Sequence, residues 1–271
     1  MQTKTSAGII CYRFNNKLKR YEVLMVRHRY TYEFSSFVKG YYNGNKTKRI
    51  INLFNKMTIQ EKIDIMSLNY DILWFRLWCS WPSEFSDYKE WTDVFKKQKT
   101  IDIINAPQTD KKRKFFVKKK KHFEDIFCKD NGSYLRHILN KSTKSAKLLW
   151  ELPKGRVDKY ENTLKTAKRE FEEETHISES KYKLKHCRPI IESFIDMSVK
   201  YKFVFYFAEC GNDVNLNVNP STPSQSLEID DIQWIGSQDI LQYCHNTRVI
   251  NRMKRIFKVI RSLKCEKSSI V

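Results

Sequence analysis

The sequence predicts an α/β fold with an all-α segment inserted after its first strands. Three observations predict it: strand-like runs at the N-terminus, a middle segment with helical periodicity, and a C-terminal half in which strands and helices alternate. With 271 residues, of which 41% are hydrophobic and 14% aromatic, the chain can bury a substantial core. Wholesale disorder is not expected, because disordered chains are poor in aromatic residues.

The N-terminal segment, residues 1–32, contains two strand-like runs, Ser6–Phe14 and Tyr21–His28. Asn15, Asn16 and Lys17 lie between them and favour a hairpin turn. Residues 33–145 are predicted to form the inserted helical domain. Its clearest local signal is Thr58 followed by Glu61, the spacing of a helix-capping box.

The C-terminal segment, residues 146–271, alternates between the two kinds of element. Helices are predicted over Asn162–Thr175 and over an amphipathic stretch whose apolar face runs from Val249 to Leu263. Strands are predicted at Leu148–Leu152, Lys183–Phe194, Tyr201–Glu209 and Ile229–Trp234. The segment therefore completes the α/β domain that residues 1–32 begin.

Positive charge dominates the composition. The chain has 51 Lys and Arg against 31 Asp and Glu, a net charge of +20, which favours polyanionic partners such as RNA. A run at residues 111–121 places eight basic residues around Phe115, Phe116 and Val117. It is either a solvated or disordered loop, or a phosphate-binding arm whose two Phe rings stack on bases. The basic residues are Lys111, Lys112, Arg113, Lys114, Lys118, Lys119, Lys120 and Lys121.

The cellular compartment is predicted from what the sequence lacks. No apolar stretch reaches the ~18 residues that a membrane-spanning helix needs, and the N-terminus lacks the apolar core of a signal peptide. The seven cysteines are scattered, without a CxxC pair, which favours reduced thiols over disulfides or a zinc site. A cytoplasmic protein without a membrane span is expected.

Three glutamates of one predicted helix carry the strongest chemical signal. Glu170, Glu173 and Glu174 are spaced i, i+3 and i+4, so they share one face near the helix C-terminus. Like charges one turn apart and the helix dipole each cost ~0.3–1 kcal/mol. Bound Mg²⁺ or Mn²⁺ would remove this conflict. The alternative, a solvated acidic face, explains the neighbouring Glu172 but explains Glu170 and Glu174 poorly.

These glutamates belong to a longer motif that resembles the Nudix box. Gly155, Glu161, Arg169 and the three glutamates occupy the defined positions of a box that spans residues 155–177. His176 stands where the family has a glycine, at a left-handed helix end that His tolerates better than most residues. Residues 149–155 are also similar to the strand that enters the box in decapping Nudix enzymes, and the insert is similar to that of their relatives in large DNA viruses.

The resemblance implies a Nudix fold, with a mixed β-sheet between α-helices, and assigns roles to individual residues. Glu170, Glu173 and Glu174 would bind Mg²⁺ or Mn²⁺ and act in catalysis, with Glu228 as general base or extra ligand. Lys154 and Arg156 would contact substrate phosphates. Structural roles fall to Gly155, which would supply a backbone turn, to Glu161, which would hold the loop, and to Arg169, which would pair with Glu173.

The implied activity is hydrolysis of the triphosphate bridge of capped mRNA, which releases methylated GDP and 5′-monophosphate RNA in the host cytoplasm or a viral factory. Two alternatives stay open. The substrate is instead an inositol pyrophosphate or a dinucleotide, or the protein is an inactive RNA-binding descendant in which His176 marks a decayed box. The insert and its basic run would bind RNA.

Residues that would contact the cap are not singled out by the sequence. Methylated guanine carries a positive charge and commonly stacks between aromatic rings. However, 14 Tyr and 17 Phe leave too many candidates. Arg27, Arg29 and Tyr30, at the end of the second predicted strand, are expected to contact substrate.

Overall fold

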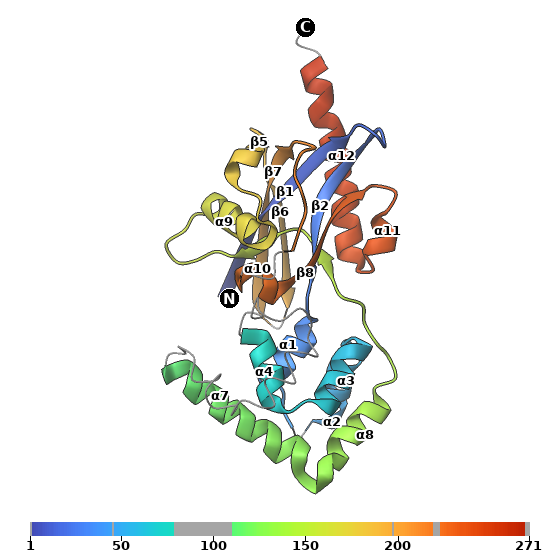
Figure 1. Cartoon of the computed structure of the whole chain (residues 1–271). Coiled ribbons are helices and arrows are strands. Elements are labelled where there is room, and N and C mark those ends of the chain that lie inside the picture. Colours follow the sequence, from blue (N-terminus) through green and yellow to red (C-terminus); the bar gives the residue numbers. More distant parts are fainter. Residues whose placement is uncertain (1, 45, 79–109, 197, 219–222, 269–271) are drawn as a thin grey trace. The chain divides into compact units, whose positions relative to one another are not determined.

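The computed structural model describes residues 2–44, 46–78, 110–196, 198–218 and 223–268 (Figure 1). The contacts divide the chain into two compact units. We call them the sheet unit, residues 1–28, 149–219 and 228–271, and the helical unit, residues 29–148 and 220–227. The long segment of the helical unit runs from Arg29 to Leu148, within a few residues of the range 33–145 that the sequence predicts for the insert.

The sheet unit is built on one mixed sheet, which in the described residues has eight strands. The main path runs β3-β2-β1-β7-β5, while β4 pairs with β1, β6 with β7 and β8 with β2. β1 and β7 are parallel, and the other pairs are antiparallel. The strands are β1 (Gln2–Asn15), β2 (Arg20–His28), β3 (Trp150–Glu151), β4 (Lys154–Arg156), β5 (Tyr182–Leu184), β6 (Ile190–Asp196), β7 (Val199–Cys210) and β8 (Ile229–Gly236).

The predicted hairpin between the first two strands is confirmed. The Asn15 side-chain oxygen accepts hydrogen bonds from the backbone N–H groups of Lys17 and Leu18, both at 3.0 Å, which closes the turn. The single strand predicted over Lys183–Phe194 is wrong, because this segment forms two strands, β5 and β6. Pro189 lies in the break between them and has no backbone N–H to offer a neighbouring strand.

Helices cover both faces of the sheet (Figure 1). α9 (Thr163–Thr175) packs Ala167 and Phe171 against one face. α12 (Thr247–Ser268), with the short α11 (Ile240–Tyr243), packs against the other face. The alternation of β1 makes this possible, since Ile9 faces the α9 side and Ile10 the α12 side. The predicted mixed sheet between helices is confirmed. Two short helices complete the connections, η3 (Glu179–Lys181) and α10 (Pro223–Glu228).

The helical unit packs around a core of aromatic rings that includes Phe34, Phe37, Phe54 and Phe127. Residues 79–109, which the sequence assigns to the same helical insert, lie outside the described residues. The described helices are α1 (Tyr32–Val38), α2 (Thr47–Phe54), α3 (Ile59–Ser67), α4 (Tyr70–Trp78), α7 (Asp110–Phe123), η1 (Glu124–Cys128), η2 (Lys129–Gly132) and α8 (Ser133–Lys141). Among the described residues, no helix is long and apolar enough to cross a membrane.

The capping box at the start of α3 is confirmed. The N–H of Glu61 donates to the Thr58 hydroxyl at 3.1 Å, and the N–H of Thr58 donates to the Glu61 carboxylate at 2.7 Å. The same carboxylate accepts two bonds from Thr31, one from its N–H at 2.6 Å and one from its hydroxyl at 2.9 Å. Glu61 is buried, and these bonds link the N-terminus of α3 to that of α1.

Both interpretations of the basic run at 111–121 need correction. The run forms α7 rather than a loop. Phe116 is buried, and both Phe rings contact Trp74, with centroid distances of 5.7 Å for Phe115 and 5.4 Å for Phe116. These rings are therefore part of the helical unit's core and are not available for stacking on bases. Helical spacing explains this, since Lys114, Lys118 and Lys121 are exposed on α7 while the two Phe residues pack inward.

Candidate active site

The helix that carries the predicted box begins and ends as the sequence predicts. Asn162 caps the N-terminus of α9 by accepting a hydrogen bond from the N–H of Lys165 at 2.8 Å. At the C-terminus, His176 adopts a left-handed conformation with φ of 57° and donates its N–H to the carbonyl of Glu172 at 2.9 Å. His176 thus takes the conformation expected of a glycine there, and the end of the helix is retained.

Gly155 allows β4 to approach the acidic face of α9. A Cβ atom on Gly155 would lie 1.8 Å from the carboxyl carbon of Glu170, so only glycine leaves room for that carboxylate. Gly155 lies inside β4 rather than in the backbone turn that the sequence suggested. Its contribution is therefore the close approach of strand and helix, which places Glu170 against the strand.

Arg169 connects the acidic groups of the box. Its guanidinium lies 2.8 Å from Glu170, 3.1 Å from Glu173 and 3.1 Å from Glu161. The predicted pairing with Glu173 is present, beside the ion pairs with Glu161 and Glu170 and a longer one with Asp158 at 4.0 Å. Glu161 also accepts a hydrogen bond from the Thr166 hydroxyl at 2.9 Å, and the bonds from Arg169 and Thr166 lower its pKa. These contacts connect the segment before α9 to the helix itself.

Glu174 lies at the buried end of the acidic cluster. Its side chain is only 5% exposed and accepts a hydrogen bond from the backbone N–H of Lys154 at 3.1 Å. Burial raises its pKa well above the usual value; the charge of Lys154 opposes this, and Glu228 and Glu170 raise it further. The pKa of Glu170 is also raised, first by burial, against the influence of Arg169, and then by Glu173 and Glu228.

The structure thus brings Glu173 and Glu228 close to Glu170, and Glu170 and Glu228 close to Glu174. Glu228 is exposed and lies at the junction of α10 and β8, where the sequence predicts a further carboxylate. In the part of the chain that the structure describes, no three Asp, Glu, His or Cys side chains are arranged as a ready ligand set. Instead, Glu170 and Glu173 contact Arg169, and Glu174 accepts a hydrogen bond from the Lys154 N–H. Their oxygen donors and mutual repulsion nevertheless fit a divalent cation such as Mg²⁺ or Mn²⁺.

The two predicted phosphate-contacting residues differ in their surroundings. The Lys154 side chain is only 11% exposed, and its ammonium lies 2.5 Å from the carboxylate of Glu151. His28 contacts the same carboxylate at 3.3 Å. Burial alone would raise the pKa of Glu151, but Lys154 and His28 hold it far below its usual range. Arg156, in contrast, is exposed at the end of β4.

A further surface lies beside β4, on the α12 side of the sheet. We call it the aromatic–basic face and define it by Lys4, Phe194, Tyr201, Phe203 and Arg248. The Phe194 ring stacks on Tyr201 and on Phe203, with centroid distances of 5.1 and 5.8 Å. The Arg248 guanidinium lies 4.6 Å from the centre of Phe194, and the Lys4 ammonium lies 5.7 Å from that of Tyr201.

Strand pairing connects the aromatic–basic face to the box. Phe203 of β7 is opposite Ser6 of β1, which in turn is opposite Arg156 of β4. The Lys154 ammonium lies 5.9 Å from the centre of the Phe203 ring. Alternating aromatic residues at 201, 203, 205 and 207 are a visible signal of one strand face. The cations beside them come from distant segments, so the sequence offers no local signal for the complete face.

The expected substrate contacts at the end of β2 are placed differently. Arg27 pairs with Asp230 at 2.6 Å and lies over the Trp150 ring at 5.5 Å, within the sheet unit. Tyr30 belongs to the helical unit, where its ring stacks on Phe34 at 5.0 Å and packs against the core. Tyr30 therefore serves packing in the helical unit, and burial raises its pKa.

The fold and the acidic helix together define a class of protein. Residues 132–258 match the NUDIX domain, and the chain belongs to the Nudix family. It is 30% identical over 238 residues to the mRNA-decapping protein g5R of African swine fever virus (isolate Pig/Kenya/KEN-50/1950), covering 86% of this chain and 85% of that protein. The g5R protein of the Warthog/Namibia/Wart80/1980 isolate is 29% identical, with 86% of this chain and 85% of that protein covered.

Two further comparisons are more distant. A protein of Acanthamoeba polyphaga mimivirus is 29% identical over 227 residues, which cover 78% of this chain and 57% of that protein. A crystal structure of a C. elegans Ap4A hydrolase binary complex covers 96% of this chain and 98% of its own, with 10% sequence identity and a TM-score of 0.44.

Proposed function

We propose that this protein is a metal-dependent Nudix pyrophosphohydrolase that removes the cap from mRNA. The observation that carries the proposal is that one unit holds the acidic cluster of α9 on one face of the sheet and the aromatic–basic face on the other, with β4 between them, whose Lys154 contacts both Glu174 and Phe203. The first feature suits a divalent cation and a pyrophosphate, and the second suits nucleobases and phosphates. Similarity to proteins named for mRNA decapping supports capped mRNA as the substrate.

The residues of the box would act on the triphosphate bridge. Mg²⁺ or Mn²⁺ held by Glu170, Glu173 and Glu174 would draw electron density from a phosphate and offset its charge. Glu228 would accept a proton from water, whose oxygen forms the new bond to phosphorus. The P–O bond that breaks leaves two phosphates on methylguanosine and one on the RNA 5′ end.

Neighbouring cations would assist without reacting. Arg169, which contacts Glu161, Glu170 and Glu173, would hold the ligands in position between substrate encounters. Arg156 is exposed and would pair with phosphate oxygens. Lys154 is occupied by Glu151, so its contribution would come through the field of its charge beside Glu174 rather than through a mobile side chain.

The aromatic–basic face would bind bases of the substrate. Its rings already face the cations Lys4 and Arg248, which would repel a positively charged methylguanine. Neutral bases near the 5′ end of the RNA chain suit the face better, since they can stack on the rings while the cations bind their phosphates. The same chemistry favours a nucleotide over an inositol pyrophosphate, which has no base to stack.

The helical unit would add affinity for RNA through the basic residues of α7. Lys114, Lys118 and Lys121 are exposed and would contact phosphates. Lys119 donates to the Gly40 carbonyl at 3.0 Å, and Lys120 pairs with Asp71 at 2.8 Å, so these two also serve the helical unit's own structure. The remaining basic residues of the run, whose side chains lie outside the described ones, are Lys111, Lys112 and Arg113.

The proposal is tested by incubating cap-labelled RNA with Mn²⁺ and the protein. Methylated GDP should appear with wild type, while Glu173→Gln should release almost none. Equal release by both proteins, or none by wild type, would contradict the proposal. An inositol pyrophosphate and uncapped RNA serve as competitors. Uncapped RNA should inhibit cleavage of both capped RNA and a free cap dinucleotide.

A further inference from the structure

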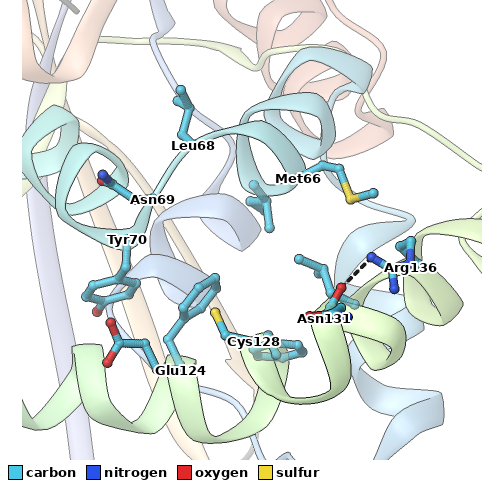
Figure 2. A pocket seen from close by; sticks show the side chains of 13 residues that line it. Met66, Leu68, Asn69, Tyr70, Glu124, Cys128, Asn131 and Arg136 are labelled. Carbon is cyan, nitrogen blue, oxygen red and sulfur yellow. Dashed lines mark hydrogen bonds between the residues drawn. The ribbon is translucent and has the colours of Figure 1, made fainter. Parts of the chain in front are cut away.

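A cavity of about 310 Å³ lies within the helical unit, between α3 and α4 on one side and α7, η1, η2 and α8 on the other (Figure 2). Three buried rings, Tyr70, Phe123 and Phe127, contribute to its mostly apolar lining. Polar groups stand at its two ends. Figure 2 shows Glu124 at one end and Asn131 with Arg136 at the other, with Cys128 between them.

The backbone around this cavity departs twice from ordinary helical structure. η1 (Glu124–Cys128) is a single turn of π-helix, and π-turns often occur at functional sites. Directly after it, Asp130, Asn131 and Gly132 are all left-handed, with φ of 50°, 53° and 74°. Asp and Asn adopt this conformation more readily than other non-glycine residues, so the sequence suits the sharp change of direction after η1.

This backbone path creates the polar end of the cavity. The Asn131 carbonyl accepts a hydrogen bond from the Arg136 guanidinium, as the dashed line in Figure 2 marks. A guanidinium has five N–H donors, so Arg136 can still donate to a ligand. At the opposite end, the Glu124 side chain is 51% exposed and offers two acceptor oxygens. The cavity therefore combines an acceptor end, a donor end and a mostly apolar lining.

We propose that this cavity binds a guanine base turned out from single-stranded RNA, an inference that rests on the RNA substrate of the proposed function. Guanine places two neighbouring donors, N1–H and N2–H, on one edge and two acceptors, O6 and N7, on another. These match Glu124 and the Arg136–Asn131 end respectively. Adenine lacks the paired donors, and the pyrimidines lack the second acceptor edge. Sequence-specific RNA recognition usually reads the hydrogen-bonding edges of unstacked bases.

Cations that could bind the flanking phosphates lie on the helix that leads into the cavity. Lys121 and Lys118 are exposed on α7, about one and two turns before Glu124. Lys120, which pairs with Asp71, lies 4.0 Å from the Glu124 carboxylate. A strand that follows these residues would present its bases to the cavity, which favours a base within RNA over a free nucleotide.

The first test measures base preference by fluorescence anisotropy. The full-length protein is titrated into oligouridine of about 12 nucleotides, a usual binding-site length, whose central residue is G, A, C or U. Wild type should bind the G-containing RNA about tenfold more tightly than the others, the discrimination typical of paired hydrogen bonds to a base. Equal affinity for all four RNAs would overturn the proposal.

Three variants separate the cavity from the phosphate contacts. Glu124→Gln should abolish the preference for G while leaving the affinity for the all-U RNA unchanged. Asp125→Asn makes the same charge change at the next, exposed position outside the cavity and should keep the preference. Lys121→Ala should weaken the binding of all four RNAs by the same factor. Retention of the preference by Glu124→Gln would also overturn the proposal.

Cys128 provides a second measurement inside the same cavity. Its thiol is exposed, so its alkylation by N-ethylmaleimide can be followed by peptide mass spectrometry. The G-containing RNA should slow this alkylation, the all-U RNA should not, and Cys187 of the sheet unit should serve as an unaffected internal control. If free GMP protects Cys128 from alkylation and all four RNAs protect it equally, the cavity is a site for free nucleotides and the proposal is wrong.

The failure of this inference is distinguishable from failure of the proposed function. Glu124→Gln should hydrolyse a free cap dinucleotide as fast as wild type, because it changes a residue of the helical unit only. Hydrolysis by wild type without a base preference would reject the cavity proposal alone. Absence of hydrolysis by wild type would reject decapping, whatever the base preference.

Discussion

Two buried glutamates, one in each unit, illustrate how differently this protein uses buried negative charge. Glu61 in the helical unit is 3% exposed, and its carboxylate receives hydrogen bonds from Thr31 and Thr58. Glu174 in the sheet unit is 5% exposed and receives one from Lys154, but its nearest charged neighbours include Glu170 and Glu228. Burial raises the pKa of both carboxyl groups.

The difference lies in what surrounds each group after burial. The hydrogen bonds from Thr31 and Thr58 lower the pKa of Glu61 and so offset its burial, which is the arrangement of a structural carboxylate. Around Glu174 the charge and the backbone N–H of Lys154 oppose the effect of burial, while the carboxylates of Glu228 and Glu170 add to it. A fold gains nothing from that repulsion, so the cluster is explained better by a cation that binds there.

The largest expected effect is a loss of catalytic activity when Glu174, but not Glu61, is substituted. Glu174→Gln should lower kcat for a cap dinucleotide by roughly 10³-fold, the size of losing a main source of transition-state charge stabilisation. Its melting temperature should not fall, because the change removes a buried charge from a repulsive cluster. Hydrolysis rates and thermal unfolding of the same sample check both halves. Full activity would show that the cluster does not take part in the reaction.

Stabilisation by a bound metal should depend on the box glutamates of the sheet unit and not on Glu61 of the helical unit. Mn²⁺ at about 100 times its dissociation constant should stabilise the wild-type fold by about 2.7 kcal/mol, since it binds only the folded site. Glu173→Gln should lose most of this gain, whereas Glu61→Gln should keep it. Calorimetric unfolding with and without Mn²⁺ provides the measurement. A gain that is equal in all three proteins would place the metal elsewhere.

Substitution of Glu61 should affect stability and leave activity unchanged, the opposite of the effect expected for Glu174. Glu61→Gln should lower the free energy of unfolding by about 2 kcal/mol, because it removes charge-assisted hydrogen bonds to two helix N-termini. Hydrolysis of a cap dinucleotide should be unchanged at a temperature where the variant is folded. Asp125→Asn, an exposed acid of the same unit, is the control that should unfold like wild type.

The aromatic–basic face should contribute less per residue. Phe194→Ala should raise KM for capped RNA by about tenfold, within the range for one stacked base, and should leave kcat nearly unchanged. Leu18→Ala is a control, since Leu18 is 56% exposed in the turn between β1 and β2. If both variants behave alike, the rings of this face do not contact the substrate.

The smallest effect concerns the departure from the family's box. His176 is left-handed, so His176→Gly should stabilise the protein by up to ~1 kcal/mol through relief of backbone strain, reduced by the larger entropy of the unfolded glycine chain. Activity should change little, because the helix end is already formed. A large gain in kcat instead would mean that His176 disturbs the glutamates before it.

Patterns within a few residues were predicted well from the sequence alone. The capping box of Thr58 and Glu61, the hairpin turn at Asn15 and the left-handed end at His176 all depend on bonds between near neighbours. The shared face of the three box glutamates follows directly from helical periodicity. Such features are readable because the chain itself fixes the distance between the groups involved.

Longer contacts were misjudged or missed for a physical reason. Phe115 and Phe116 lie in a strongly basic run, and only packing against Trp74 of another helix shows that they belong to the core. No local pattern indicates that Gly155 makes room for the Glu170 carboxylate, because that approach depends on how β4 meets α9.

By itself, the sequence determined the α/β architecture, the helical insert pattern and the acidic helix, since these depend on periodicity and local hydrogen bonding. Only the tertiary structure decided which cations contact which aromatic rings in the aromatic–basic face. The parallel pairing of β1 with β7 brings Lys4 beside Tyr201, and α12 adds Arg248 over Phe194. It also formed the cavity between Glu124 and Arg136, because a cavity exists only where separate helices meet.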